Sequence, residues 1–69
     1  MLLDRRRKIF LEHLGDFCYV SYNIDQSRYG RLIDVTNNEI IIEHINGMRT
    51  WIIPLFEIRK FNFRRYKNI

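Results

Sequence analysis

The sequence contains one cysteine, one proline and three glycines, and it has no long apolar run. It therefore lacks the disulfide pairs typical of small secreted proteins and the apolar segments typical of membrane proteins. A small secreted domain usually carries several paired cysteines, so the lone Cys18 predicts a reducing, cytoplasmic environment. Cys18 itself is typical of a small buried hydrophobe. Because no apolar stretch approaches the roughly 18 residues of a membrane helix, and charged residues follow Leu3 at once, we expect neither a membrane span nor a signal peptide.

Patterns of catalysis and metal binding are also missing from the sequence. The two histidines, His13 and His44, have no second His, Cys or carboxylate at metal-ligand spacing. The chain contains no glycine-rich phosphate loop and no nucleophile motif. We therefore expect a protein that is not an enzyme and that holds neither a metal nor a cofactor.

Apolar and aromatic residues are plentiful for a chain of this length. Hydrophobic residues make up 46% of the 69 positions, and ten residues are aromatic. This composition is too apolar for a disordered chain, and the length allows one domain, residues 1–69. A domain this small buries a modest share of its surface, so some apolar surface is expected to remain for a partner subunit.

Charge is distributed unevenly along the chain. Nine of the twelve basic residues lie near the two ends, whereas residues 9–58 hold three basic and seven acidic residues. A concentrated basic surface attracts polyanions such as nucleic acid or an anionic membrane. Charged ends also keep a small apolar domain soluble, so both interpretations stay open at this point.

The hydrophobic pattern predicts one helix followed by strands. Residues 1–14 form the expected N-terminal helix, with Ile9, Phe10, Leu11 and Leu14 on its apolar side; Gly15 fits the position just beyond its end. Aromatic and β-branched runs then predict five strands and, after the fourth, a one-turn 3₁₀-helix at 54–58. The strands are expected at residues 17–22, 29–35, 39–45, 48–53 and 59–63.

Two short signals predict how the strands connect. Asn46-Gly47 is the strongest hairpin signal in the chain and predicts a type I′ turn. Gly30 predicts a bulge or sharp bend in the second strand. Since no segment is left for a crossover helix, the fold class is mainly β: an N-terminal helix, then a five-stranded, strongly bent antiparallel barrel over residues 16–63, and a basic tail at 64–69.

The order of these elements resembles the Sm-like family, and within it the bacterial Hfq group. The resemblance runs from about Lys8 to Phe63 and is carried by four segments: Phe10-Leu11-Glu12-His13-Leu14, Gly30-Arg31-Leu32-Ile33-Asp34-Val35, Ile40-Ile41-Ile42 and Ile52-Ile53-Pro54-Leu55-Phe56-Glu57-Ile58. It implies the barrel fold and a ring of subunits. Ile53-Pro54 stands where the Hfq group has a Lys-His pair, and Asn37-Asn38 does not match the Asp and Asn register of Sm proteins. SH3-like barrels share the same pattern.

The C-terminal segment interleaves aromatic and basic residues, which suits single-stranded RNA because cations meet phosphates and rings meet bases. A solvated edge strand protected by charge would look the same. Most aromatic residues, Tyr19 and Tyr29 among them, are expected in the core or an interface. The candidate nucleic-acid-binding residues are Arg5, Arg6, Arg7, Lys8, Arg59, Lys60, Arg64, Arg65, Tyr66 and Lys67.

The exposed edge strands predict how copies of the chain would assemble. An open five-stranded barrel leaves its fourth and fifth strands exposed, and head-to-tail pairing of such edges closes into a ring when the rotation allows. We therefore expect a non-catalytic RNA-binding protein that forms a homo-oligomeric ring. The alternative is an SH3-like protein-interaction or structural barrel that has a protein partner and binds no nucleic acid.

Overall fold

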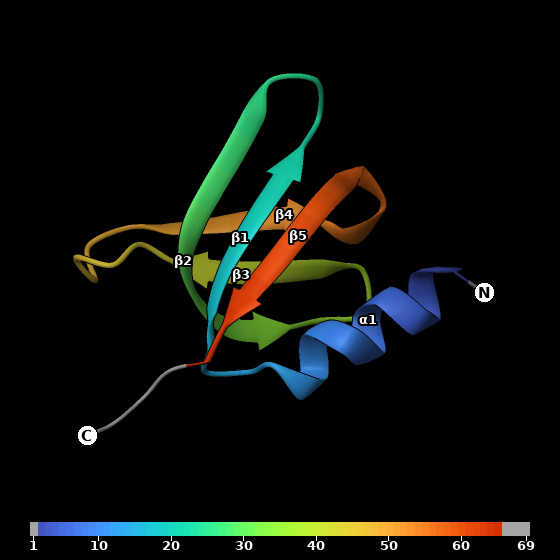
Figure 1. The fold of residues 1–69 in the computed structure, drawn as a ribbon, viewed down its shortest axis with the longest axis horizontal. Coiled ribbons are helices and arrows are strands. Elements are labelled where there is room, and N and C mark those ends of the chain that lie inside the picture. Colours follow the sequence, from blue (N-terminus) through green and yellow to red (C-terminus); the bar gives the residue numbers. More distant parts are fainter. Residues whose placement is uncertain (1, 66–69) are drawn as a thin grey trace.

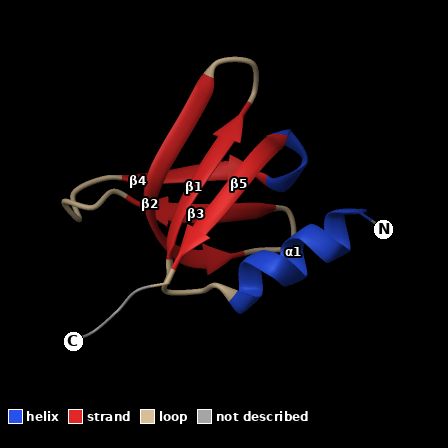
Figure 2. Ribbon diagram, in the orientation of Figure 1, coloured by secondary structure: helices blue, strands red, loops and turns tan. Residues whose placement is uncertain are grey.

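The computed structural model describes residues 2–65, with side chains from Arg5 onward. The chain forms α1 (Leu2–Glu12), β1 (Phe17–Tyr22), β2 (Gln26–Val35), β3 (Glu39–Glu43), β4 (Thr50–Pro54), the 3₁₀-helix η1 (Leu55–Glu57) and β5 (Ile58–Arg64). Figures 1 and 2 show the helix at one end of a sheet whose β1–β5 part crosses over its β3–β4 part. None of the helices formed by these residues has the length and apolar character needed to cross a membrane.

All five strands belong to one antiparallel sheet in the order β4-β3-β2-β1-β5. The expected helix followed by five antiparallel strands is therefore confirmed. The sheet is not closed by hydrogen bonds, because β4 and β5 lie at its two edges and do not pair with each other. β2 begins at Gln26, three residues before the predicted start, because its first residues pair with the end of β1.

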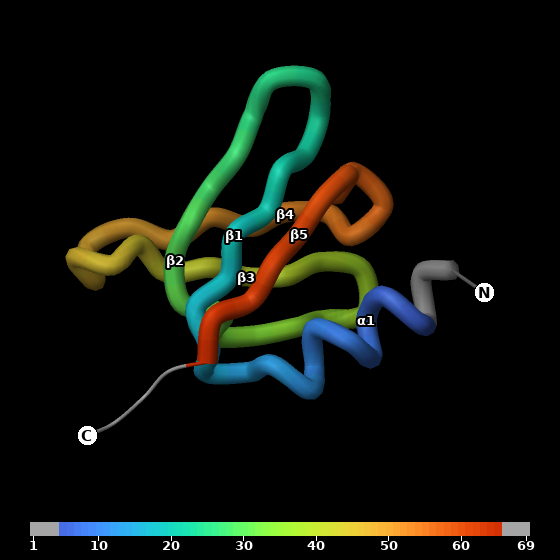
Figure 3. Tube along the Cα trace, viewed as in Figure 1, coloured from blue at the N-terminus to red at the C-terminus, as the bar shows by residue number. Residues whose placement is uncertain are grey.

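The sheet bends where β2 passes from β1 to β3, as the tube in Figure 3 shows. Gly30 lies at this place, and a side chain there would collide with the Glu43 carbonyl oxygen and come within 2.7 Å of Ile42 Cγ2. The pairing of β2 with β3 shifts register between Leu32 and Asp34. The bend predicted at Gly30 is confirmed, and its cause is the close approach of the β3 backbone.

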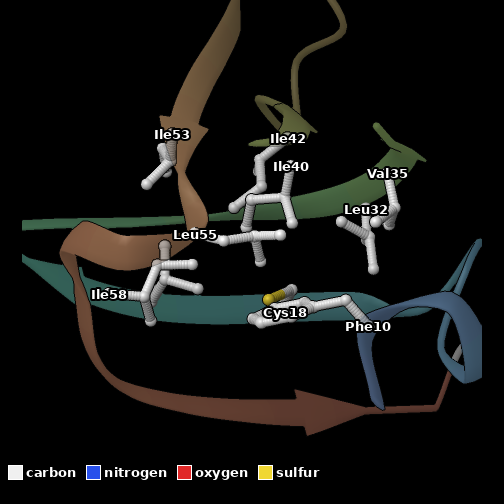
Figure 4. Close-up of a cluster of buried hydrophobic side chains, with 10 residues drawn as sticks. Phe10, Cys18, Leu32, Val35, Ile40, Ile42, Ile53, Leu55 and Ile58 are labelled. Atoms are coloured by element: carbon white, nitrogen blue, oxygen red, sulfur yellow. The ribbon is translucent and has the colours of Figure 1, made fainter. Parts of the chain in front are cut away.

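The core lies between the two crossing parts of the sheet and under α1 (Figure 4). It contains ten buried hydrophobic residues: Phe10, Cys18, Val20, Leu32, Val35, Ile40, Ile42, Ile53, Leu55 and Ile58. Phe10 is the helix residue in this core, and its ring packs against Phe61 and Phe63 at 4.9 and 5.2 Å between centroids. The expectation of a broader apolar helix face is wrong, since Ile9, Leu11 and Leu14 each remain more than a third exposed.

Two turns differ from expectation in detail. The helix ends at Glu12, and Gly15 follows with φ of +92° and donates its N–H to the Leu32 carbonyl. The hairpin at Asn46-Gly47 is present, but only Gly47 has positive φ (73°), so the type I′ prediction is wrong. His44 instead pairs with Arg49 and closes a longer loop, in which Met48 N–H donates to the Asn46 side chain.

Candidate nucleic-acid interface

The outward face of β2, β1 and β5 carries two exposed tyrosines side by side. Along β1 the buried Cys18 and Val20 point into the core, so Tyr19 between them points outward. Tyr19 is the direct register partner of Tyr29 on β2 and of Asn62 on β5. Each tyrosine is 42% exposed, which leaves ring surface accessible in the middle of three paired strands.

Rows of residues on both sides of the tyrosines complete a surface that we call the tyrosine platform. Phe17 has Arg31 and Arg64 as its register partners, and Ser21 has Ser27 and Lys60. The platform thus consists of nine residues in three rows: Arg31, Phe17 and Arg64; Tyr29, Tyr19 and Asn62; Ser27, Ser21 and Lys60. Three of the nine are basic and none is acidic, so the platform combines aromatic surface with positive charge.

Local contacts hold this surface in shape. The Phe17 and Tyr29 rings lie nearly parallel, with an interplanar angle of 12° and 6.0 Å between centroids. Arg31 Nε donates to the Gly15 carbonyl at 3.1 Å, which fixes its side chain at the base of the α1–β1 turn. Beside the central row is a hollow of about 300 Å³ lined by Tyr19, Tyr29, Asn62, Phe63 and Arg64. The three cations therefore border a surface on which Phe17 and Tyr29 are stacked.

The C-terminal candidate residues divide between the platform and its surroundings. Lys60 and Arg64 belong to the platform, and Arg65 follows directly after β5 and is exposed. Arg59 is exposed on β5, where its guanidinium donates to the Asn23 carbonyl at 3.4 Å. Tyr66 and Lys67 lie outside the described residues.

The helix candidates lie on another part of the molecule. α1 packs through Phe10 on Phe61 and Phe63, which point to the inner side of β5, whereas the platform is the outer side. Arg6 donates to the carbonyls of Leu55 and Ile58 at 3.0 and 2.7 Å. In the same segment Arg7 Nε donates to the Thr36 carbonyl at 3.1 Å, while Arg5 and Lys8 are exposed. Among residues 5–65, the basic positions of α1 and those of β5 on the platform therefore lie on different surfaces.

Sequence reasoning missed the aromatic centre of the platform, because it expected Tyr19 and Tyr29 in the core or an interface. It also did not include Arg31 among the candidate residues. The signal that would have found Tyr19 is the alternation Cys18-Tyr19-Val20: two small apolar residues facing inward force the residue between them outward. Tyr29 then follows, because it is the partner of Tyr19 across a hairpin.

The two histidines make local contacts, and the cysteine is buried. His13 stacks on Phe63 with 3.9 Å between ring centroids, and its Nδ1 lies 3.0 Å from Asp16 Oδ2. His44 Nδ1 accepts the Asn46 N–H at 3.1 Å inside the β3–β4 loop. Burial raises the pKa of the Cys18 thiol to about 12, which keeps it protonated and unreactive at neutral pH.

The residues from Leu2 to Arg65 contain no group of three or more His, Cys, Asp or Glu side chains that could hold a metal ion. What this region offers instead is the tyrosine platform, an exposed aromatic surface with basic residues in two of its three rows. Comparisons of the chain with protein-family models, curated proteins and solved structures found no match.

Proposed function

We propose that this protein is a non-catalytic module that binds single-stranded RNA on the tyrosine platform. The observation that carries the proposal is the central row, in which Tyr19 and Tyr29 are adjacent, exposed and bordered by Arg64 and Lys60. Unpaired bases stack on exposed aromatic rings, and each stack contributes on the order of 1–3 kcal/mol. Arginine and lysine beside the rings meet the phosphates that connect the bases.

The tyrosine platform is better suited than α1 to be the primary RNA contact. Arg6 and Arg7 already donate to backbone carbonyls and are half-buried, so their guanidinium groups have little left for phosphates. Arg5 and Lys8 carry exposed charge on α1. They add general attraction for a polyanion, whereas the platform adds base contacts.

We propose further that the bent sheet is an Sm-like barrel and that copies of it assemble into a homo-oligomeric ring. Support comes from the free edges: β4 and β5 lack a neighbour on one side among the described strands. Head-to-tail pairing of these two edges would close into a ring where the rotation allows, and a ring would present several platforms to one RNA strand and raise avidity.

Binding of short fluorescent oligoribonucleotides tests the RNA proposal. Fluorescence anisotropy with oligo-U and oligo-A should give saturable binding at about 50 mM salt, and affinity should fall as salt rises, with a slope of about −0.7 per phosphate contacted. A duplex of the same length should bind more weakly, because its bases are not free to stack. Absence of binding to every single strand at low salt would refute the proposal.

Light scattering tests the ring separately. A ring should give one species several times the 8.6 kDa mass of the chain. A charged substitution on the β4 edge, Ile52→Lys, should shift that species toward monomer, because Ile52 is 60% exposed on this strand and contributes little to the core of a single subunit. A wild-type monomer at micromolar concentration would rule out the ring and leave the RNA proposal standing.

A protein-interaction or structural barrel is the second candidate, and one observation favours it. Ile41 and Ile52 are register partners on the outward face of β3 and β4, and Ile33 on β2 is 43% exposed. Apolar side chains gathered on one face suit a protein partner. Under this alternative the freshly purified protein carries no nucleic acid, and Tyr19→Ala changes no binding reaction while Ile52→Lys abolishes capture of the partner.

A further inference from the structure

A second concave surface lies between β2 and the loop that joins β3 to β4. Figures 1 and 3 show this loop projecting past β2, away from the end of the sheet where α1 packs. The groove has a volume of about 790 Å³. Its lining comes from both sides: Ser27, Arg28 and Tyr29 on β2, and His44, Ile45, Asn46, Met48, Arg49 and Trp51 around the β3–β4 loop.

Trp51 forms the aromatic part of the groove. Its side chain is half-buried against the core, and the His44 ring meets it edge to face at 5.4 Å. The Arg28 guanidinium lies over the indole at 5.2 Å from the ring centroid. Arg28 Nε is buried and has no hydrogen-bond partner within the described part of the chain. An unpaired buried donor is energetically costly, and this donor lies next to Trp51.

Charge and polarity indicate what the groove would accept. The lining includes two arginines, Arg28 and Arg49, and no carboxylate. It also includes Ile45 and Met48, which are 66% and 86% exposed. A ligand that fits this lining has an anionic group for the arginines and a flat, weakly polar part for Trp51 and Met48. A nucleotide has both parts.

Tyr29 lines both the groove and the hollow beside Tyr19, so the two surfaces meet at β2. Arg28, the register partner of the buried Val20, faces the opposite side of the sheet from Tyr29, so an RNA strand would pass from the platform to the groove around the edge of residues 27–29, which do not pair with β3. We infer that the groove binds the next nucleotide of the RNA strand that lies on the tyrosine platform, with its base against Trp51 and its phosphate between Arg49 and Arg28. This inference rests on the proposed function and extends it: the binding path runs from Arg64 across the two tyrosines into the groove. The minimal ligand is then longer than the platform alone can hold.

The single tryptophan makes this inference directly measurable, because all tryptophan fluorescence of the chain comes from the groove. The intact protein is titrated with 3′-fluorescein-labelled oligo-U for anisotropy, and with unlabelled oligo-U for Trp51 emission. Stacking of a base on the indole should quench emission with the same midpoint as the anisotropy change. Oligomers too short to pass beyond the platform should bind weakly and leave the emission unchanged.

One pair of variants separates the groove from general electrostatics. Arg49→Gln removes an exposed cation of the groove and retains Trp51; it should weaken oligo-U binding roughly three- to tenfold and reduce the salt slope by about 0.7. Arg5→Gln removes one exposed cation from α1 and should change affinity less than twofold. The two variants carry the same charge change, so a difference in their oligo-U affinities shows that the location of the cation matters.

The outcomes distinguish binding in the groove from binding on the platform. Anisotropy binding with unchanged Trp51 emission would overturn the groove and leave the platform intact. No anisotropy change and no quenching would overturn both. Equal quenching by poly-glutamate, which carries charge without bases, would overturn the assignment of the groove to a nucleotide. Quenching by oligo-U that Arg49→Gln weakens and Arg5→Gln does not is the expected result.

Discussion

Arg6 lies in the basic N-terminal cluster, and we predict that it stabilises the folded state. Its guanidinium donates to the carbonyls of Leu55 and Ile58 at 3.0 and 2.7 Å and lies 5.9 Å from the centroid of the Phe61 ring. These contacts tie α1 to η1 and β5, at the place where the chain turns from one sheet edge to the other. A hydrogen bond from a charged group contributes about 1.5–3 kcal/mol. Replacement of Arg6 by Met keeps the aliphatic stem and removes both bonds. Because both bonds are only part-buried, water can partly replace them, and the loss should be about 2–3 kcal/mol, below the sum of two full contributions.

The assay is chemical and thermal unfolding followed by circular dichroism. For a domain of this size the expected loss corresponds to a decrease in Tm of roughly 10–20 °C. Arg5→Met is the matched control, because Arg5 is exposed and surface substitutions change stability by about 0.5 kcal/mol or less. Equal Tm values for the two variants would refute the structural role of Arg6. Below its Tm the Arg6→Met protein should retain RNA affinity within a factor of about two, since Arg6 is not on the platform.

Two further predictions concern the core and the bend. Gly30→Ala should destabilise the fold by about 3 kcal/mol or more, because its Cβ meets the β3 backbone; Gly47→Ala, which has open space but positive φ, should cost about 1 kcal/mol, and urea unfolding compares them. Equal costs would contradict the close approach at Gly30. The Cys18 thiol should not react with Ellman's reagent until the protein unfolds. Its raised pKa also predicts that stability is lost as pH rises from 9 toward 12, where only the unfolded thiol ionises; Cys18→Ala should flatten that part of the pH profile.

Local pattern was enough to predict the order of the elements. Alternating and β-branched runs placed all five strands, because strand periodicity reflects which side of each residue meets the core. The close match for β1, Phe17–Tyr22, follows from its aromatic and β-branched composition. The boundaries of β2 and β4 were less accurate, since they depend on how far partner strands extend and not on the residues themselves.

Features that depend on long-range contacts were not accessible to the sequence. The β3–β4 loop carries the Asn46-Gly47 signal, yet the pairing of His44 with Arg49 fixes a longer loop than the dipeptide alone predicts. Charge counting grouped the basic ends of the chain, but it could not show that Arg6 would donate to carbonyls some fifty residues away.

The candidate site shows the same division. Arg64 and Lys60 were found from composition, because basic residues interleaved with aromatic ones are visible in a linear sequence. The central row was not found, because Tyr19, Tyr29 and Asn62 become neighbours only through the register of three strands. The groove at Trp51 depends on a bend in β2, which Gly30 signals, and on the length of the β3–β4 loop, which the Asn46-Gly47 dipeptide alone does not give.

The most direct test of the central claim compares RNA affinities of two double variants of equal charge change. Tyr19→Ala combined with Arg64→Gln removes one ring and one cation from the platform; Leu11→Ala combined with Arg5→Gln removes one partly exposed apolar side chain and one cation from α1. Anisotropy with oligo-U should show a loss of about thirtyfold or more for the platform variant, from one stack and one phosphate contact, and less than threefold for the helix variant. An equal loss for both, or a greater loss for the helix variant, would contradict the account.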